Sequence, residues 1–282
     1  MVSAFWEQVV ADGHVPQDRP LSDLTAELTR MLGDPDPSVR DGIAFATLAT
    51  WIGAGVYDAL LPALGDGMCA GLAVGLGESG TDTVYRRSSS ALVLAGCIDR
   101  DSAARVLDTD SVLRWGDRAM AWLVRERDLR GFVPGRGWAH AVAHGADVLG
   151  ALARSSHLGR SELVVLLDVV ADRLLSPTEE FFVAGEPDRL ALAVLQVLRR
   201  DLVGIALLEP WVARLAAHAA PGHGRAGRHP FQIAGNVQAF LRSLQLQLQL
   251  GAPRPQVRSD LLLALVDALR ATNADYFPPH EH

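Results

Sequence analysis

The sequence contains no lysine and only two cysteines among its 282 residues. Cys69 and Cys97 stand in apolar stretches without CxxC spacing, which excludes a disulfide framework and a zinc knuckle. All 26 basic residues are arginines, and they face 33 acidic residues, so the net charge is -7. A net acidic chain does not suit a protein whose main task is to coat nucleic-acid phosphates. Nucleic acid is therefore an unlikely partner.

A leader segment and long apolar runs are also missing. The first residues, from Met1 to Glu7, lack a basic region followed by an apolar one, and charged or turn residues interrupt every long apolar stretch. We expect a cytoplasmic protein that makes no membrane contact.

Aromatic residues are few, at 6%, whereas hydrophobic residues make up 49% of the chain and are mostly Ala, Leu and Val. Ala and Leu are strong helix formers, and Ala also allows helices to approach closely. No alternation of strands with helices is visible, which argues against a parallel α/β fold. The composition predicts an all-α protein.

A HEAT-like repeat is indicated by residues 34–41, DPDPSVRD, which precede an apolar segment at residues 42–51. Prolines end the preceding helix, Asp or Ser caps the next one, and Val and Arg occupy its first turn. We expect a HEAT-like α-α superhelix, which is a solenoid of antiparallel helix pairs.

Helix-sized segments follow one another, separated by short breaks of Gly, Pro, Asp or Ser. A pair period of about 40 to 47 residues predicts roughly six pairs in a single domain over residues 1–282. The one long Gly/Pro-rich break, residues 221–230, is predicted to be a mobile loop. The expected helices are Leu60–Leu76, Thr83–Ile98, Ser111–Asp128, Trp138–Arg154, Ser161–Leu175, Asp188–Arg200, Ile205–Ala219, Pro230–Leu250 and Gln256–Thr272.

The segment Leu244–Leu250 alternates Leu with Gln, which is the pattern of a half-buried strand. Leu and Gln are nevertheless good helix formers, and no second strand is available for pairing. We therefore predict that this segment continues a helix.

The densest group of charged, histidine and aromatic side chains lies between residues 125 and 147. On a helix over residues 138–154, His140, His144 and Asp147 fall within about 60° of one another. They face away from the apolar stripe of that helix. The candidate ligand-binding residues are Glu126, Asp128, Arg130, Arg136, Trp138, His140, His144 and Asp147.

Trp138 would begin the apolar stripe of this helix, with Val142 and Leu149 following it. Replacing a core tryptophan with alanine destabilises a protein by roughly 3 to 5 kcal/mol. We expect a loss of this size for Trp138→Ala if the interpretation is right.

Two histidines at positions i and i+4 with a carboxylate nearby are ligand types for zinc, iron or manganese. His140 and Asp147 would be about 10 Å apart along the helix axis, too far to bind one ion together with His144. A divalent metal would instead take His140 and His144 with Glu126 or Asp128.

A second interpretation is anion binding at the start of this helix. Gly135, Arg136 and Gly137 precede it, so backbone N–H groups, Arg136, Arg130 and His140 could hold a phosphate or a carboxylate. A third interpretation is structural, because polar clusters in helical repeats often cap neighbouring helices and hold one repeat to the next. These alternatives remain open at the level of sequence.

Residues 136–147, RGWAHAVAHGAD, resemble the domain-of-unknown-function family 2785. Supporting likenesses are residues 126–131 and 87–90 before this segment, and residues 188–190 and 240–244 after it. The resemblance spans roughly residues 30 to 270. It implies a helical-repeat fold, and it implies that Arg130, Trp138, His140, His144 and Asp147 belong to the family's pattern.

Three classes of function follow from these observations. The first is a non-enzymatic binding protein that holds a protein, a peptide or a small anionic ligand on the concave face of the solenoid. The second is a metal-dependent or acid-base enzyme that uses His140, His144, Asp147 and the pair Glu126 and Asp128. The third is a nucleic-acid-binding protein similar to the HEAT-like DNA glycosylases, which acidity places last.

Overall fold

The computed structural model describes residues 4–219, 231–274, 276 and 277. These residues are mostly helical, and two short strands form the sheet structure among them, so the all-α class is confirmed. The chain divides into two compact units, Met1–His157 and Leu158–His282. The expectation of one domain over residues 1–282 stays a prediction, and the Gly/Pro-rich break lies outside the described residues.

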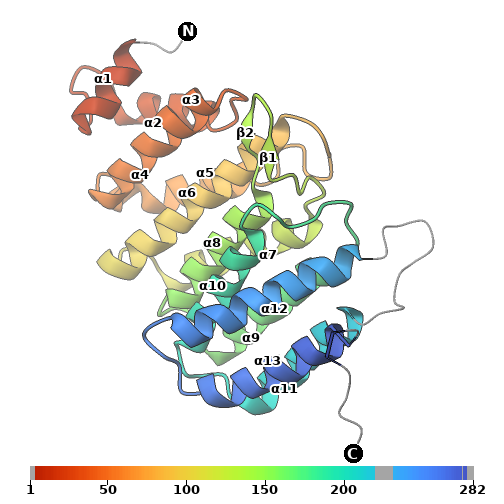
Figure 1. The fold of residues 1–282 in the computed structure, drawn as a ribbon. Helices are drawn as coiled ribbons and strands as arrows, with labels where there is room; N and C mark the ends of the chain where they lie inside the picture. Colours follow the sequence, from red (N-terminus) through yellow and green to blue (C-terminus); the bar gives the residue numbers. More distant parts are fainter. Residues whose placement is uncertain (1–3, 220–230, 275, 278–282) are drawn as a thin grey trace, which may run out of the picture. The chain divides into compact units, whose positions relative to one another are not determined.

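The first unit is drawn from red to green in Figure 1. Helix α6 packs along α8 and also contacts α4 and α5, while α7 packs against α5 and α8. Its helices are α1 (Ala4–Asp12), α2 (Leu21–Met31), α3 (Pro37–Val39), α4 (Ala46–Gly53), α5 (Leu61–Gly71), α6 (Thr83–Ala104), α7 (Thr109–Arg125) and α8 (Ala141–Arg154), with a π-helical segment at Arg40–Phe45 and a 3-10 turn at Asp58–Leu60.

Five helices form the described part of the second unit. Helix α10 packs on α12, and α11 packs on α13, while α12 also contacts α11 and α13. These helices are α9 (Arg160–Leu175), α10 (Glu186–Leu198), α11 (Ile205–Ala219), α12 (Gln232–Leu250) and α13 (Arg258–Thr272).

Helix starts follow the expected capping chemistry. Asp36 caps α3 by accepting the Ser38 N–H at 2.9 Å, and Pro37 occupies the first turn, where its missing N–H does no harm. Pro187 stands in the first turn of α10 in the same way. The sequence signals for these two helix starts are confirmed.

The Leu-Gln segment is helical, as predicted, and its burial explains the alternation. Leu244 and Leu248 are buried at positions i and i+4 of α12, whereas Leu246 and Leu250 are exposed. Residues four apart lie on the same face of a helix, so every second leucine of this alternating segment belongs to one buried stripe.

The helix predicted to start at Trp138 starts three residues later, at Ala141, so the prediction was wrong there. Trp138 instead belongs to strand β2 (Gly137–Trp138), which pairs antiparallel with β1 (Phe132–Val133). Pro134 and Gly135 connect the strands, and the Arg136 N–H donates to the Val133 carbonyl at 3.0 Å. With φ of 74° at Gly135, this is the Pro-Gly pattern of a type II turn.

Helix α7 also ends earlier than predicted, at Arg125 rather than Asp128. Glu126 has an extended backbone, with φ -61° and ψ 130°, so Glu126 and Asp128 lie on the segment that leads to the hairpin. The side chains of both residues accept backbone N–H groups there.

No single helix in the described part of the chain combines the length and apolarity needed to cross a bilayer, while the bent pair Pro37–Gly53 and Asp58–Gly71, at 106°, meets the criterion by length and composition alone.

Candidate functional site

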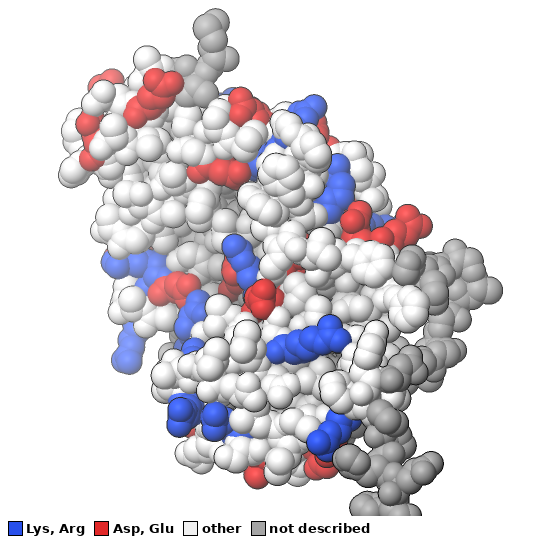
Figure 2. Space-filling view, in the orientation of Figure 1, with Lys and Arg blue, Asp and Glu red and all other residues white. Residues whose placement is uncertain are grey.

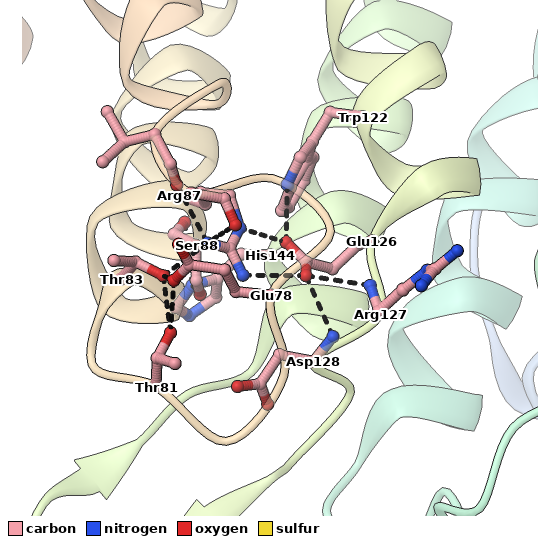
Figure 3. A network of polar contacts seen from close by, with 12 residues as sticks. Glu78, Thr81, Thr83, Arg87, Ser88, Trp122, Glu126, Arg127, Asp128 and His144 are labelled. Carbon is pink, nitrogen blue, oxygen red and sulfur yellow. Dashed lines mark hydrogen bonds and ion pairs between the residues drawn. The ribbon is translucent and has the colours of Figure 1, made fainter.

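A buried ion pair lies beside the hairpin. Arg87 of α6 donates its Nε–H to Glu126 Oε2 at 2.5 Å and its Nη2–H to Oε1 at 2.9 Å, and both side chains are fully buried (Figure 3). Trp122 also donates its indole N–H to Glu126 Oε2 at 2.9 Å. A buried charge pair is tolerated only when its remaining donors and acceptors are satisfied.

The other polar groups of this pair are indeed satisfied. Arg87 Nη1 donates to the Val74 and Gly75 carbonyls and to the Thr83 hydroxyl, at 2.8 to 3.0 Å. Glu126 Oε1 accepts the backbone N–H groups of Arg127 and Asp128 at 2.9 Å each. The pair thus fixes the loop before α6 to the end of α7.

Asp128 is buried and is the partner of Arg130. Its Oδ1 accepts the Arg130 Nε–H at 2.8 Å, and its Oδ2 accepts the Nη2–H at 2.7 Å. The Gly80 N–H donates to the same Oδ2 at 2.9 Å, and Arg130 Nη2 donates to the Thr81 carbonyl. Asp128 and Arg130 therefore join the segment after α7 to the turn before α6.

The turn of the hairpin contacts residues 37–40, at the start of the segment that includes α3. Arg40 donates to the Arg136 carbonyl at 3.0 Å, and a Cβ at Gly137 would come within 3.0 Å of Pro37. Gly137 has φ of 74°, a conformation that L side chains rarely adopt. The close approach and the positive φ together explain why glycine stands there.

His144 is buried and faces α6. Its Nδ1 lies 2.7 Å from the Ser88 hydroxyl and 3.2 Å from the Ser88 carbonyl. The prediction placed His144 opposite the apolar stripe of its helix, and that side of α8 is packed as well, since α8 is buried around most of its circumference. His144 helps to hold α8 to α6.

His140 occupies the N-cap of α8 in the left-handed conformation, with φ 50° and ψ 32°. Its N–H donates to the Arg130 carbonyl at 3.1 Å, and its carbonyl accepts the His144 N–H at 2.9 Å. A residue other than glycine in this region costs roughly 1 to 3 kcal/mol, and such strain gathers at ligand sites. The backbone strain at His140 makes this position a candidate functional residue.

Trp138 and Phe132 form an exposed aromatic pair on the hairpin. Trp138 stacks on His140, with ring centroids 4.1 Å apart and an interplanar angle of 23°, and it meets Phe132 edge-on at 5.0 Å. Trp138 is 44% exposed and Phe132 57% exposed. The prediction that Trp138 begins a buried stripe is wrong, because the hairpin places its ring at the surface.

The rings of Phe132, Trp138, His140 and His144 form a continuous row, since His140 also meets His144 edge-on at 5.7 Å. Asp147 is half-buried, three residues further along α8. The structure thus gathers Trp138, His140 and His144, while Glu126 and Asp128 are engaged by arginines. Phe132 is not among the site residues predicted from the sequence, although the Pro-Gly turn that follows it indicates a hairpin.

A metal site finds no support in the described residues: no group of three or more His, Cys, Asp or Glu side chains is placed there to hold an ion. Glu126 and Asp128, the expected carboxylate ligands, already bind arginines and backbone N–H groups. Either carboxylate would have to leave a buried ion pair to reach a metal.

A second polar group that sequence reasoning missed joins the end of α6 to the start of α7. His157 Nε2 lies 3.0 Å from Asp101 Oδ2, and its Nδ1 lies 2.9 Å from the Thr109 hydroxyl. Asp101 Oδ1 also accepts the N–H groups of Val106 and Leu107. The buried carboxylate thus organises the α6–α7 turn.

Acidic and basic side chains are interspersed on the face drawn in Figure 2. Arginines and acidic residues are both visible among the described residues of each unit.

The family model of the proteins of unknown function designated DUF2785 matches residues 72–246. This range contains the Arg87–Glu126 pair, the hairpin and the whole of α8. Comparison with the curated proteins gives no match, and comparison with the solved structures gives none either.

Proposed function

This chain belongs to the DUF2785 family of proteins of unknown function, and we propose that it is a non-enzymatic helical binding protein whose ligand stacks on Trp138. The observation that carries the proposal is the exposed Trp138 ring, held against His140 whose backbone is strained. A surface tryptophan fixed by a strained neighbour is an arrangement that core packing does not require.

We also propose that the helix pairs of each unit are HEAT-like repeats. In the first unit α4 contacts α6, α5 contacts α7 and α6 contacts α8, and in the second α10 contacts α12 and α11 contacts α13. Contacts between alternate helices are typical of stacked helix pairs. The proposed ligand site belongs to the first unit, and a cytoplasmic location is part of the same proposal.

The chemistry of the site favours a small ligand with a planar ring. Aromatic side chains bind planar groups by offset stacking and edge contacts, and the rings of both Trp138 and Phe132 are exposed. The hairpin also carries Arg136, two residues before Trp138, and the Arg130 carbonyl accepts the His140 N–H, so two arginines lie in the same short segment as the stacked rings. A ring that bears a phosphate or a carboxylate therefore fits best.

The acid-base alternative is weaker, because a catalytic carboxylate must reach a substrate. Glu126 accepts bonds from Arg87, Trp122 and two backbone N–H groups, and Asp128 from Arg130 and Gly80. Carboxylates bonded in this way serve structure rather than proton transfer.

A thermal-shift panel on the full-length protein tests the proposal. The panel holds nucleoside monophosphates, aromatic carboxylates and sugar phosphates at millimolar concentration. We expect at least one ring-bearing anion to raise the unfolding midpoint, because a ligand that binds only the folded state stabilises it. Trp138→Ala should abolish the shift.

Tyr276, an exposed aromatic outside the hairpin, provides the matched control. Tyr276→Ala should keep the full shift. A ligand whose effect persists in Trp138→Ala would place the binding site elsewhere, and a panel without any shift for ring-bearing anions would contradict the proposed ligand class.

A further inference from the structure

The start of helix α6 has unused hydrogen-bonding capacity. In the first turn the Tyr85 N–H donates to the Asp82 carbonyl at 3.2 Å, whereas the side chain of Asp82, the N-cap, makes no capping hydrogen bond to the first N–H groups of the helix. The helix is 22 residues long, so its dipole places partial positive charge at this end. A second feature lies at the same end of the helix.

That feature is Tyr85, in the first turn of α6. The side chain is completely buried, yet its hydroxyl has no hydrogen-bond partner. Leaving a buried hydroxyl unpaired costs free energy, which a protein accepts where the group serves another purpose. The Arg40 guanidinium lies over the Tyr85 ring, 4.4 Å from its centroid.

Two further arginines reach this helix start from the hairpin segment. Arg130 donates to the carbonyl of Thr81, one residue before Asp82, and its Nη1 makes no hydrogen bond to the described part of the chain. Arg136 Nη1 meets Asp82 Oδ2 at 3.3 Å, longer than the 2.7 to 2.9 Å of a strong charge-assisted bond. Both side chains are partly exposed.

We propose that the uncapped start of α6, the Tyr85 hydroxyl, Arg130 and Arg136 form a binding site for a phosphate or carboxylate group. In this site the Tyr85 O–H and the helix N–H groups donate to the anion, and Arg136 turns from Asp82 to the anion. The proposal rests on the proposed function, because it supplies the anionic half of the ligand that stacks on Trp138.

The electrostatics of Tyr85 agree with this geometry. Burial raises the pKa of the Tyr85 hydroxyl, while the charges of Arg130, Arg40 and Arg136 act in the opposite direction. The hydroxyl therefore stays protonated and available as a donor, and it stands in the field of three arginines. Asp82 is the competing charge, since its carboxylate opposes those arginines.

Glu78 is the other carboxylate near this turn. Its Oε2 accepts the hydroxyls of Thr81 and Thr83 at 2.9 and 2.8 Å, so it is engaged with side chains of the loop (Figure 3). Asp128 is likewise held by Arg130. Asp82, half-exposed and weakly paired, is the acidic group that an incoming anion would displace.

Calorimetric titration of the full-length protein with inorganic phosphate and with pyrophosphate tests the site. We expect both anions to bind, and Tyr85→Phe to weaken binding about tenfold, the size of one hydrogen bond to a charged group. The same variant should unfold at the same or a higher temperature without an anion, because it removes an unpaired buried hydroxyl.

Asp82→Asn gives a change in the opposite direction. Removing the competing carboxylate should tighten phosphate binding about three- to tenfold, as expected for one nearby charge. Asp110, an exposed acid in the first turn of α7, is the matched control, and Asp110→Asn should alter the affinity less than twofold.

Absence of phosphate and pyrophosphate binding at millimolar concentration would overturn the proposal, as would equal affinity in wild type, Tyr85→Phe and Asp82→Asn. Failure of the proposed function looks different: the anions bind and respond to Tyr85 and Asp82, while no ring-bearing anion depends on Trp138. If a ring-bearing anion binds through Trp138 but its affinity is unchanged in Tyr85→Phe, the proposed function holds and the anion site proposed at α6 is rejected.

Discussion

At the scale of single residues, the proposed function depends most on Trp138. It lies on the surface and stacks on His140, whereas Trp115 is completely buried and donates to Asp66 at 2.9 Å. Because Trp138 is exposed, the loss of about 3 to 5 kcal/mol expected for a core tryptophan no longer applies. We predict that Trp138→Ala lowers the free energy of unfolding by about 1 kcal/mol, the size of one ring-stacking contact. Trp115→Ala should cost about 3 to 5 kcal/mol. Urea unfolding curves of both variants check this, and equal losses would show Trp138 to be a core residue.

Glu186, buried in the first turn of α10, supplies a prediction of pH dependence. Burial raises the pKa of its carboxyl above the ordinary value, so the folded protein holds the proton more tightly than the unfolded chain. Ionisation therefore destabilises the fold as pH rises through the ordinary pKa towards the raised one, and below about pH 4 the effect is absent.

We predict that Glu186→Gln raises the unfolding midpoint at pH 7 and leaves it unchanged near pH 4. Exposed Glu209 gives the control, and Glu209→Gln should leave the midpoint unchanged at both pH values. Thermal unfolding followed by circular dichroism measures the difference. A gain of equal size at both pH values would mean that burial of the charge is not its cause.

At the scale of elements, the Arg87–Glu126 pair joins α6, the loop before it and the end of α7. Breaking a buried ion pair leaves a charge without a partner, so Arg87→Ala should cost about 3 to 5 kcal/mol in denaturant unfolding. Arg100 pairs with Asp58 at 2.6 Å, but both side chains are partly exposed to solvent. Arg100→Ala should therefore cost less than about 1 kcal/mol. Similar losses for the two variants would refute a special role for the buried pair.

Local signals in the sequence predicted helix starts correctly, but they did not predict the hairpin. The capping of α3, the Pro187 start of α10 and the helical Leu-Gln segment follow from local chemistry and are confirmed. The hairpin was overlooked because the spacing of Trp138, His140 and His144 fits a helix, while the positive φ at Gly135, Gly137 and His140 breaks it. Local turn chemistry decides this boundary, not periodicity.

At the scale of the whole molecule, the family and the all-α class were predictable, because both depend on patterns along the chain. The candidate site depends on contacts between distant segments, such as Arg87 with Glu126 and His144 with Ser88. Neither pairing has a sequence signature. Tyr85 in particular stands in an ordinary helical position, and only the buried surroundings of its hydroxyl distinguish it.

The central claim, that a ligand covers Trp138, is tested most directly by acrylamide quenching of tryptophan fluorescence in the full-length protein. Five of the six tryptophans are buried, and Trp138 is the exposed one, so it should provide nearly all the quenchable emission. We predict that the best ring-bearing anion of the thermal-shift panel suppresses this quenching, and that Trp138→Phe lacks the quenchable fraction. Unchanged quenching of Trp138 at a saturating concentration of that compound would contradict the account.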